Sequence, residues 1–515
     1  MDKNYLQKEI LEAEYERSEW TKVLREWFGV KQINQIPQLI NRDTSDWNDY
    51  VENAYELGRL YTDGGEREVG IFEVKLTSNP KIAINRVKLR SLLSNIYGNV
   101  DGALIIFTQD DKWRFSYVSE ILDRDANDNV ISVKTEPKRY TYFFGKGENC
   151  RTAADRFDKL KGKPLTLTDL TEAFSVEKLS KEFFKTYKEH FEKFWKYLAD
   201  DESYYNLLSD QEKDDEVKRT KPIRDFVKIL LGRMVFLQFL QKKGWMGVPM
   251  SRSDYKGGDL KFNQNLFARF ADKNHFHSTA LRTLFFETLN KKRPNDRADE
   301  SLGESIKIPY LNGGLFDKDV SAEHAIDFPA DYFRDLLNFF EQYNFTIDES
   351  DAFDREVGID PEMLGHIFEN LLEENREKGA FYTPKEIVHY MCQESLIEYL
   401  STNLSGDDRA DIELLVRHNV VAESIQNDYK RATAINELLK AVKICDPAIG
   451  SGAFPMGLLK EMFECRRLLF APTKSENFSA AQIKKEIIQN NIHGVDIELG
   501  AVDIARLRFW LSLDR

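Results

Sequence analysis

The pattern of hydrophobic and polar positions divides the chain into three regions. Residues 1 to about 165 mix helix and strand signals, with short β-branched and aromatic runs bounded by Gly or Asp, namely VGIFEVKL, GALIIFT and WRFSYVS. From about 166 to 370, Phe and Leu recur at three- and four-residue spacing, which is typical of helices. From about 371 onward, helix and strand signals alternate, as they do around a parallel sheet. The pattern predicts an α/β region, a helical connector and a second α/β region.

The connector contains the clearest helix signal, the stretch PIRDFVKILLGRMVFLQFLQKKG. Pro222 suits a first helical turn, Lys242 and Lys243 suit a last turn, and Gly244 suits a C-terminal cap. One apolar stripe runs along this helix: Ile223, Phe226, Val227, Leu230, Leu231, Met234 and Leu237. We expect the stripe to pack in the core of the connector.

Composition excludes two broad classes of protein. Of 515 residues, 42% are hydrophobic, which is enough to build large cores and excludes wholesale disorder. The richest apolar stretch carries Lys228 and Arg233 and falls short of the ~20 apolar residues that a membrane span needs. The first 20 residues are charged throughout and have no signal-peptide core. We therefore expect no association with a membrane.

The cysteines and the net charge say less about the class of protein than the composition does. Four cysteines show no CxxC pairing, so we interpret them as reduced thiols of a cytoplasmic protein: Cys150, Cys392, Cys445 and Cys465. The net charge of -14 argues against a non-specific nucleic-acid binder with a basic surface. It leaves room for an enzyme that holds DNA in a local basic cleft, so the motifs must decide.

A first group of candidate catalytic residues lies in YTDGGEREVGIFEVKL. Gly64 and Gly65 predict a hairpin turn, and a strand follows. Glu73 and Lys75 are two residues apart on that strand and so share a face. We expect the hairpin to bring Asp63, at the end of the preceding strand, beside Glu73.

Two neighbouring carboxylates repel each other unless a cation lies between them. Mg²⁺ held by Asp63 and Glu73 would activate a water and polarise a phosphodiester, and Lys75 would orient the water and offset phosphate charge. Glu66 or Glu68 could replace Asp63 as the first acid. The alternative without any function is that Glu73 and Lys75 face solvent on an amphipathic strand.

This segment resembles the metal-dependent nucleases of the PD-(D/E)xK type. The stretch after it also fits, because KIAINRVKLRSLLSNIY predicts a helix and GALIIFT a buried strand. Four basic side chains on that helix could face phosphates: Lys81, Arg86, Lys88 and Arg90.

A second group of candidate residues lies in KICDPAIGSGAFPMGLLKEMF. The stretch predicts a short buried strand, a tight glycine-containing turn and a helix, an order that places a ligand at a helix N-terminus. Gly450 and Gly452 allow close approach of the backbone. Further on, IHGVDI predicts another short strand with Asp496 at its C-terminal end, where an acid commonly binds ribose hydroxyls, and Ile497 could pack on an adenine ring. A dinucleotide turn or a purely structural loop would give the same glycine signal.

Three motifs follow one another along the chain: GAFYTP, DPAIGSGAF and HGVDIE. In this order they resemble the motifs of amino-methylating DNA methyltransferases, especially the gamma-class adenine enzymes. The resemblance implies that the methionine part of S-adenosylmethionine is flanked by Phe381, Tyr382, Thr383 and Pro384. It implies that the cofactor loop consists of Asp446, Pro447, Ala448, Gly450, Ser451, Gly452 and Phe454, with Asp496 on the ribose.

The whole chain resembles the Type IIG restriction-modification enzymes, most sharply over residues 61–76 and 358–515. That resemblance implies a PD-(D/E)xK nuclease-like α/β domain over 1–165, an all-helical connector over 166–370, and the first half of a Rossmann-like methyltransferase domain over 371–515. It implies a prokaryotic, cytoplasmic phage-defence protein that cleaves double-stranded DNA with Mg²⁺ as a transient dimer on DNA. The same protein would methylate adenine N6 with S-adenosylmethionine.

The family's catalytic tetrapeptide, Asn-Pro-Pro-Tyr or a near relative, does not occur in the sequence. That motif holds the flipped adenine, so we expect no methyl transfer from residues 1–515 alone. Two other interpretations stay open: a phage-defence adenine methyltransferase without an active nuclease, and a non-catalytic fragment that binds S-adenosylmethionine.

Overall fold

The computed structural model describes residues 1–41, 45–78, 96, 100–119, 122–124, 130–133, 137–255, 257–311, 314–346, 354–363, 365, 383–404, 409–473 and 478–513. The chain forms two compact units. The first comprises Met1–Lys185, Asn338–Thr346 and Ser350–Ile359, and the second comprises Thr186–Leu337, Ile347–Glu349 and Asp360–Arg515.

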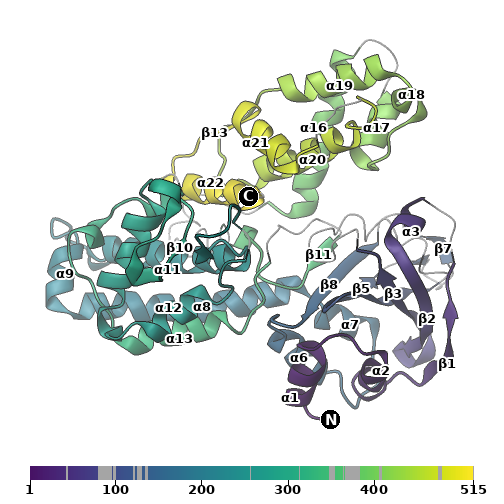
Figure 1. Ribbon diagram of the computed structural model, residues 1–515, viewed down its shortest axis with the longest axis horizontal. Coiled ribbons are helices and arrows are strands. Elements are labelled where there is room, and N and C mark those ends of the chain that lie inside the picture. The colour runs from purple at the N-terminus through teal and green to yellow at the C-terminus, as the bar shows by residue number, and fades with distance from the viewer. Residues whose placement is uncertain are drawn as a thin grey trace. The chain divides into compact units, whose positions relative to one another are not determined.

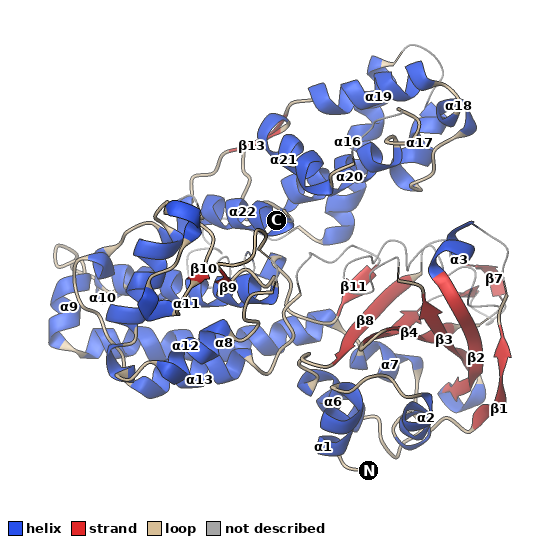
Figure 2. Ribbon diagram, viewed as in Figure 1, coloured by secondary structure: helices blue, strands red, loops and turns tan. Residues whose placement is uncertain are grey.

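A mixed sheet organises the first unit (Figures 1 and 2). Within the described residues it has seven strands in the order β1-β2-β3-β4-β5-β8-β11. The pairs β3–β4 and β8–β11 are parallel and the other neighbours antiparallel. The strands are β1 Gln32–Leu39, β2 Val51–Thr62, β3 Arg67–Leu76, β4 Gly102–Gln109, β5 Lys112–Ser119, β8 Lys138–Gly145 and β11 Asp354–Glu356, and a separate pair is β6 Leu122–Arg124 with β7 Val130–Val133. The three expected strand segments and the hairpin between β2 and β3 are confirmed.

The two faces of this sheet carry different cores. Because side chains alternate along a strand, Phe72, Val74 and Leu76 of β3 point to one face, where they pack with residues such as Phe107 of β4. On the other face, Trp113 and Phe115 of β5 begin an aromatic cluster with Trp20, Phe28, Phe157 and Phe174. The helical elements of this unit are α1 Lys3–Tyr5, η1 Leu6–Leu11, α2 Arg17–Glu26, α3 Ser45–Tyr50, η2 Asp63–Gly65, α6 Arg151–Asp158 and α7 Leu167–Ala173.

Strand β11 was not expected from the sequence. Residues 354–356 lie in the stretch predicted to be helical, yet they pair in parallel with Arg139–Thr141 of β8. Glu356 of this strand is buried and accepts a hydrogen bond from Arg114 Nη1 of β5 at 2.8 Å. The chain thus returns to the first unit after the helical region. The buried ion pair between Glu356 and Arg114 helps to hold this short strand against β8. A strand of three residues is too short to give a periodic signal in the sequence.

The second unit begins with the helical region. Helix α8, Val176–Asp200, runs across the boundary between the two units. The other elements of this region are α9 Glu202–Leu208, α10 Glu216–Arg219, α11 Lys221–Lys242, β9 Val248–Pro249, α12 Phe262–Arg269, η3 Lys273–His275, η4 His277–Leu281, η5 Thr283–Leu289, η6 Pro294–Asp296, η7 Glu300–Leu302, β10 Ile306–Lys307, η8 Gly314–Phe316, η9 Val320–Ala322 and α13 Ala330–Phe340. Helical structure therefore dominates here, as the sequence indicated.

Helix α11 confirms the sequence prediction closely. It spans Lys221–Lys242, with Pro222 in its first turn and Gly244 just beyond its end at φ 72°. The whole predicted stripe is buried, and so are residues on the remaining sides, such as Val235 and Phe239. From Leu230 to Gln241 the helix is buried on every side, so this part lies at the centre of a core, whereas its first turn, with Lys221 exposed, reaches the surface.

Truncation of this central helix is expected to destabilise the second unit. Leu231→Ala removes three side-chain carbons at a fully buried position, so the free energy of unfolding should fall by about 2–5 kcal/mol. Leu260→Ala is the matched control, because Leu260 is 54% exposed and should cost less than about 0.5 kcal/mol. Denaturant unfolding of both variants checks this, and equal losses would contradict the placement of α11.

The C-terminal part of the second unit consists of helices with two short strands. Its elements are α16 Lys385–Asn403, α17 Arg409–Arg417, α18 Glu423–Gln426, α19 Tyr429–Ala441, β12 Ile444–Asp446, α20 Ala453–Leu468, α21 Ala480–Asn490, β13 Ile492–Gly494 and α22 Leu499–Ser512. One apolar core joins them, including Leu396 of α16, Ile435 of α19 and Met462 of α20.

All four cysteines of the chain are free thiols. Among the described helices, none is both long enough and apolar enough to cross a membrane.

Candidate functional site

Two short parallel strands bring the candidate cofactor acids to one edge. Strand β12 pairs with β13 so that Asp446 lies opposite Gly494. The backbone continues this pairing beyond β13, because Val495 N donates to Asp446 O at 3.0 Å. Asp446 and Asp496 therefore follow neighbouring strand ends, which is where parallel α/β sheets bind ligands.

The turn between β12 and α20 is held by these same acids. Asp446 Oδ1 accepts from Ala448 N at 3.0 Å, and Asp496 Oδ2 accepts from Gly450 N at 2.8 Å. Gly450 and Gly452 have φ values of 51° and 91°, in the left-handed region that favours glycine. A Cβ at Gly452 would also lie 3.0 Å from Cβ of Ala505. The glycines thus serve both the shape of the turn and its packing on α22.

Helix α22 supports the turn from behind. Arg508 is buried, and its Nη1 donates to Ser451 O at 2.6 Å. Ser451 is itself buried, and a Cβ placed on Gly365 would clash with its hydroxyl. Sequence reasoning missed Arg508, because a single arginine within the helix stretch after Asp496 gives no local signal of its partner.

Of the remaining cofactor candidates, Phe454 and Ile497 lie close in the chain to the turn and to Asp496, and the others precede α16. Phe454 lies in the first turn of α20, and Ile497 is 97% exposed, so its side chain is free to contact a ligand. Thr383 is half-buried and Pro384 is the N-cap of α16. Phe381 and Tyr382 lie outside the described residues.

The start of α16 is fixed by ion pairs that the sequence did not reveal. Lys385 Nζ lies 3.1 Å from Asp360 Oδ2 and also pairs with Glu362. Both carboxylates are buried. Because Lys385 directly follows Pro384, these pairs set the position of the Thr383–Pro384 motif.

The candidate nuclease residues Glu73 and Lys75 share a face of β3 but have different surroundings. Glu73 is 6% exposed and lies opposite Tyr55 of β2. The Lys75 side chain is 56% exposed, and its Nζ lies 2.9 Å from Glu52 Oε1. Lys75 is thus accessible, whereas Glu73 is enclosed beneath the N-terminal segment.

Asp63 does not lie beside Glu73. It begins the hairpin turn with φ 54°, and its Oδ2 accepts from Leu167 N at 3.0 Å. The register pairs Thr62 with Arg67, so Glu73 lies six residues further along β3 than the turn, or about 20 Å at the rise of a strand. The hairpin separates the two acids because the ladder continues all the way to the turn.

The two alternative first acids do not face Glu73 either. Glu66 is exposed and ends the turn. Glu68 lies an odd number of residues from Glu73 on the same strand, so it points to the opposite face, and its carboxylate pairs with Arg59 at 2.8 Å. The expected basic helix with Lys81, Arg86, Lys88 and Arg90 lies outside the described residues.

Glu73 instead contacts two residues from the N-terminal segment. Tyr15 OH donates to Glu73 Oε2 at 2.6 Å, and Arg17 Nε donates to the same oxygen at 2.9 Å. Arg17 Nη2 donates to Oε1. The hydrogen bonds to Glu73 raise the pKa of Arg17, while burial and then the nearby carboxylate raise the pKa of Tyr15 well above its ordinary value. This contact could not be predicted from the sequence, because 56 residues separate Arg17 from Glu73.

This arrangement does not fit a divalent cation. Both oxygens of Glu73 are occupied by donors, and Asp63 is remote from it. Within the described part of the chain, no group of three or more His, Cys, Asp or Glu side chains could hold a metal ion. Mg²⁺ prefers several oxygen ligands in octahedral geometry, which these side chains do not supply as they lie.

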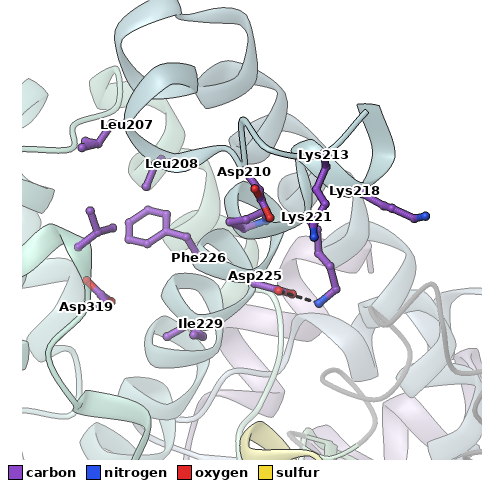
Figure 3. A pocket seen from close by; sticks show the side chains of 12 residues that line it. Leu207, Leu208, Asp210, Lys213, Lys218, Lys221, Asp225, Phe226, Ile229 and Asp319 are labelled. Carbon is purple, nitrogen blue, oxygen red and sulfur yellow. Dashed lines mark hydrogen bonds and ion pairs between the residues drawn. The ribbon is translucent and has the colours of Figure 1, made fainter. Parts of the chain in front are cut away.

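A separate cavity of about 570 Å³ lies in the helical region and contains none of the motif residues. Figure 3 shows apolar side chains, among them Leu207, Leu208 and Phe226, beside a group of lysines. Lys221 is paired with Asp225 at 3.0 Å, and Asp210 and Asp319 also line the cavity. Since acids offset the lysines, the cavity has no clear preference for an anion.

The chain is similar to proteins of restriction-modification and DNA methylation. It is 30% identical over 330 residues to a protein of Methanocaldococcus jannaschii named as a type II restriction enzyme and methyltransferase, covering 60% of this chain and 26% of that protein. It is 23% identical over 312 residues to the adenine-specific methyltransferase PglX of Lacticaseibacillus casei, covering 49% of this chain and 25% of that protein. The similarity confirms the resemblance to restriction-modification enzymes that the motifs indicated.

The chain spans about a quarter of the length of the curated relatives it matches. No protein-family model matches it. Among solved structures, the DNA complex of the Type IIL restriction-modification enzyme MmeI aligns with 56% of this chain and 33% of its own, at a TM-score of 0.37 and 18% identity.

Proposed function

We propose that the C-terminal part of the second unit binds S-adenosylmethionine for the modification of DNA. The observation that carries this proposal is the meeting of Asp446 and Asp496 at the ends of two parallel strands, around a glycine turn that opens α20. The names of the two relatives described above both include the word methyltransferase, which supports the proposal that this region binds S-adenosylmethionine.

The residues at this edge fit the cofactor chemically. Asp496 accepts hydrogen bonds from Gly450 N and Glu498 N, so its carboxylate is held where it can also accept from ribose hydroxyls. The exposed Ile497 offers an apolar surface to an adenine ring. The turn before α20 allows backbone approach to the methionine part, and Thr383 and Pro384 would flank it. When bound, the cofactor supplies the methyl group, and this chain's residues bind and orient it.

Isothermal titration calorimetry tests this proposal. S-adenosylmethionine and S-adenosylhomocysteine should both bind with one site per chain, because they share the adenosine and amino acid groups that the turn would contact. NAD and ATP are the controls, and we expect binding at least ten-fold weaker. Tighter binding of NAD would show that the turn belongs to a dinucleotide site, and absence of all binding would refute the proposal.

Arg508 should matter for this binding without touching the cofactor. Arg508→Met removes a charged donor to Ser451 O from a buried site, so the free energy of unfolding should fall by about 1–3 kcal/mol. A loosened turn should also weaken S-adenosylmethionine binding about ten-fold. Arg506→Met is the control, because the Arg506 side chain is 65% exposed. If folded Arg508→Met binds S-adenosylmethionine with unchanged affinity, Arg508 does not hold the turn in its binding conformation.

We also propose that the first unit cleaves DNA. The observation that favours this second activity is the E-x-K pair on β3, an inner strand of the mixed sheet, where an accessible Lys75 lies two residues from Glu73 on the same face. Lys75 would bind a phosphate and offset the charge that develops during hydrolysis. Asp63 remains a prediction from the resemblance alone, since it lies at the turn.

The complete proposal is a restriction-modification protein that acts on double-stranded DNA. Its functional parts would be a nuclease-like region over 1–165, a helical connector over 166–370 and a methyltransferase region from 371 onward. A transient dimer on DNA would provide two nuclease sites for a double-strand break. If the protein modifies DNA but has no nuclease, Glu73→Ala will not alter cleavage, and if it only binds the cofactor, neither cleavage nor methylation will be measurable.

A further inference from the structure

We propose that Lys243, the C-cap residue of α11, is a positioning residue for the turn between β12 and α20 and acts on that turn through α22. The inference rests on the proposed binding of S-adenosylmethionine and concerns how its site is held in place. It arises because α22 contacts both the turn and the helical region of the second unit.

The C-terminal end of α22 takes its cations from other helices. The last carbonyls of a helix have no partner within it and carry a partial negative charge, so this end favours basic groups. The last turn, residues 509–512, contains no Lys or Arg of its own. Lys243 Nζ donates to Leu513 O at 2.8 Å and also to Leu511 O. Lys484 Nζ of α21 donates to Ser512 O at 3.0 Å.

Lys243 is itself fixed to the core of the helical region. It directly follows the part of α11 that is buried on every side, and its amide donates to Phe239 O at 3.0 Å. Its ammonium lies 4.6 Å from the ring centroid of Trp245, which is buried. The Trp245 ring in turn packs edge-on against Trp510 of α22, with centroids 6.2 Å apart. The end of α22 is therefore attached to α11 by both a lysine and a tryptophan.

The same helix contacts the turn only a short distance from this end. Arg508, which donates to Ser451 O, precedes Leu511 by three residues, or about 4.5 Å along the helix axis. One turn earlier, Ala505 lies where a Cβ on Gly452 would contact it at 3.0 Å. A helix acts as a rigid element over such a distance, so a shift of its end is carried to Arg508. The position of the turn thus depends on Lys243, although the two are far apart in the sequence.

Hydrogen exchange of the full chain without cofactor is the first test. Lys243→Met removes the charged donor and keeps an unbranched stem, so the amides of residues 448–454 should exchange about three-fold faster or more. Lys243→Arg retains a charged donor and should exchange like the wild type. The amides of α17, elsewhere in the same unit, are the internal reference and should keep their rates. Lys291→Met is the control, because the Lys291 side chain is 62% exposed in the helical region, and it should change nothing.

A second variant carries the test if Lys243→Met does not fold. Lys484→Met removes the donor to Ser512 O without changing α11, so it should also speed exchange in the turn, by a smaller factor. Unchanged exchange of the turn in the folded variants overturns the inference. Equal acceleration in α17 overturns it as well, because Lys243 would then stabilise the whole region and not position the turn.

Cofactor affinity tests whether this positioning matters for binding. Lys243→Met should weaken S-adenosylmethionine binding about five-fold in calorimetric titration. Because Lys243 acts through α22 and Arg508, its effect should disappear when Arg508→Met is already present. Losses of affinity that simply add in the double variant would show that the two residues act independently, which contradicts the inference.

The two measurements separate this inference from the function on which it rests. If the wild type does not bind S-adenosylmethionine, the proposed function is refuted, while faster exchange in the turn of Lys243→Met still supports the positioning role. If the wild type binds and exchange in the turn is the same in every variant, the proposed function is supported and the positioning role is refuted.

Discussion

Lys75→Ala should reduce DNA cleavage by about a hundred- to ten-thousand-fold, the range over which a single positioned side chain contributes to catalysis. The loss should come from chemistry and not from folding. Lys75 is 56% exposed and its ion pair with Glu52 lies at the surface, so removal of the pair should cost at most about 1 kcal/mol of unfolding free energy. The measurement is the single-turnover rate of plasmid cleavage with saturating Mg²⁺.

The chain offers a matched control for this variant. Lys22 has a side chain that is 54% exposed and pairs with Glu19 on α2, so it shares the chemistry and exposure of Lys75 without the E-x-K position. Lys22→Ala should cleave at the wild-type rate. Equal rates for Lys75→Ala and the wild type would show that the E-x-K pair is an ordinary feature of an amphipathic strand.

The second large effect is expected at Asp496. Asp496→Ala should weaken S-adenosylmethionine binding about a hundred-fold, because it removes the acceptor for ribose and the acceptor that holds Gly450 N. Hydrogen bonds to a charged group contribute about 1.5–3 kcal/mol each, and every 1.4 kcal/mol is about a ten-fold change in affinity. Calorimetric titration of the folded variant measures the loss.

A surface acid of the same region separates binding from general charge effects. The Glu437 side chain is 60% exposed on α19 and pairs with Lys440, so Glu437→Ala should leave the affinity within about two-fold. Asp496→Asn is the informative intermediate, since it retains an acceptor oxygen for Gly450 N but loses the charge. An unchanged affinity in Asp496→Ala would remove this residue from the cofactor site.

The sequence was informative wherever local chemistry fixes the structure. Helix α11 follows from a 3.6-residue apolar period with Pro222 and Gly244 at its ends, and the hairpin at Gly64–Gly65 follows from turn chemistry. The strand, turn and helix around Asp446 were likewise expected, because glycines at positive φ leave a recognisable pattern. The prediction that this strand is buried was wrong, since Cys445 is exposed and its two neighbours are half-buried. These features depend on residues close together in the chain.

Pairing between distant segments could not be predicted in the same way. The wrong expectation for Asp63 is a different kind of error, because the turn of a hairpin fixes its register: Thr62 pairs with Arg67, so Glu73 lies six residues beyond the turn. Strand β11 is too short for a periodic signal and forms beside β8 only because the folded chain brings it there.

The chain's own sequence therefore determined its element types, its two motif groups and its likeness to restriction-modification proteins. Only the tertiary structure decided which partners those motif residues have: Arg17 and Tyr15 on Glu73, Arg508 behind Ser451, and the buried acids that hold Lys385. The physical reason is range. Periodicity and turn chemistry act over a few residues, whereas the charge and hydrogen bonding of a buried side chain are set by whichever segment the fold packs against it.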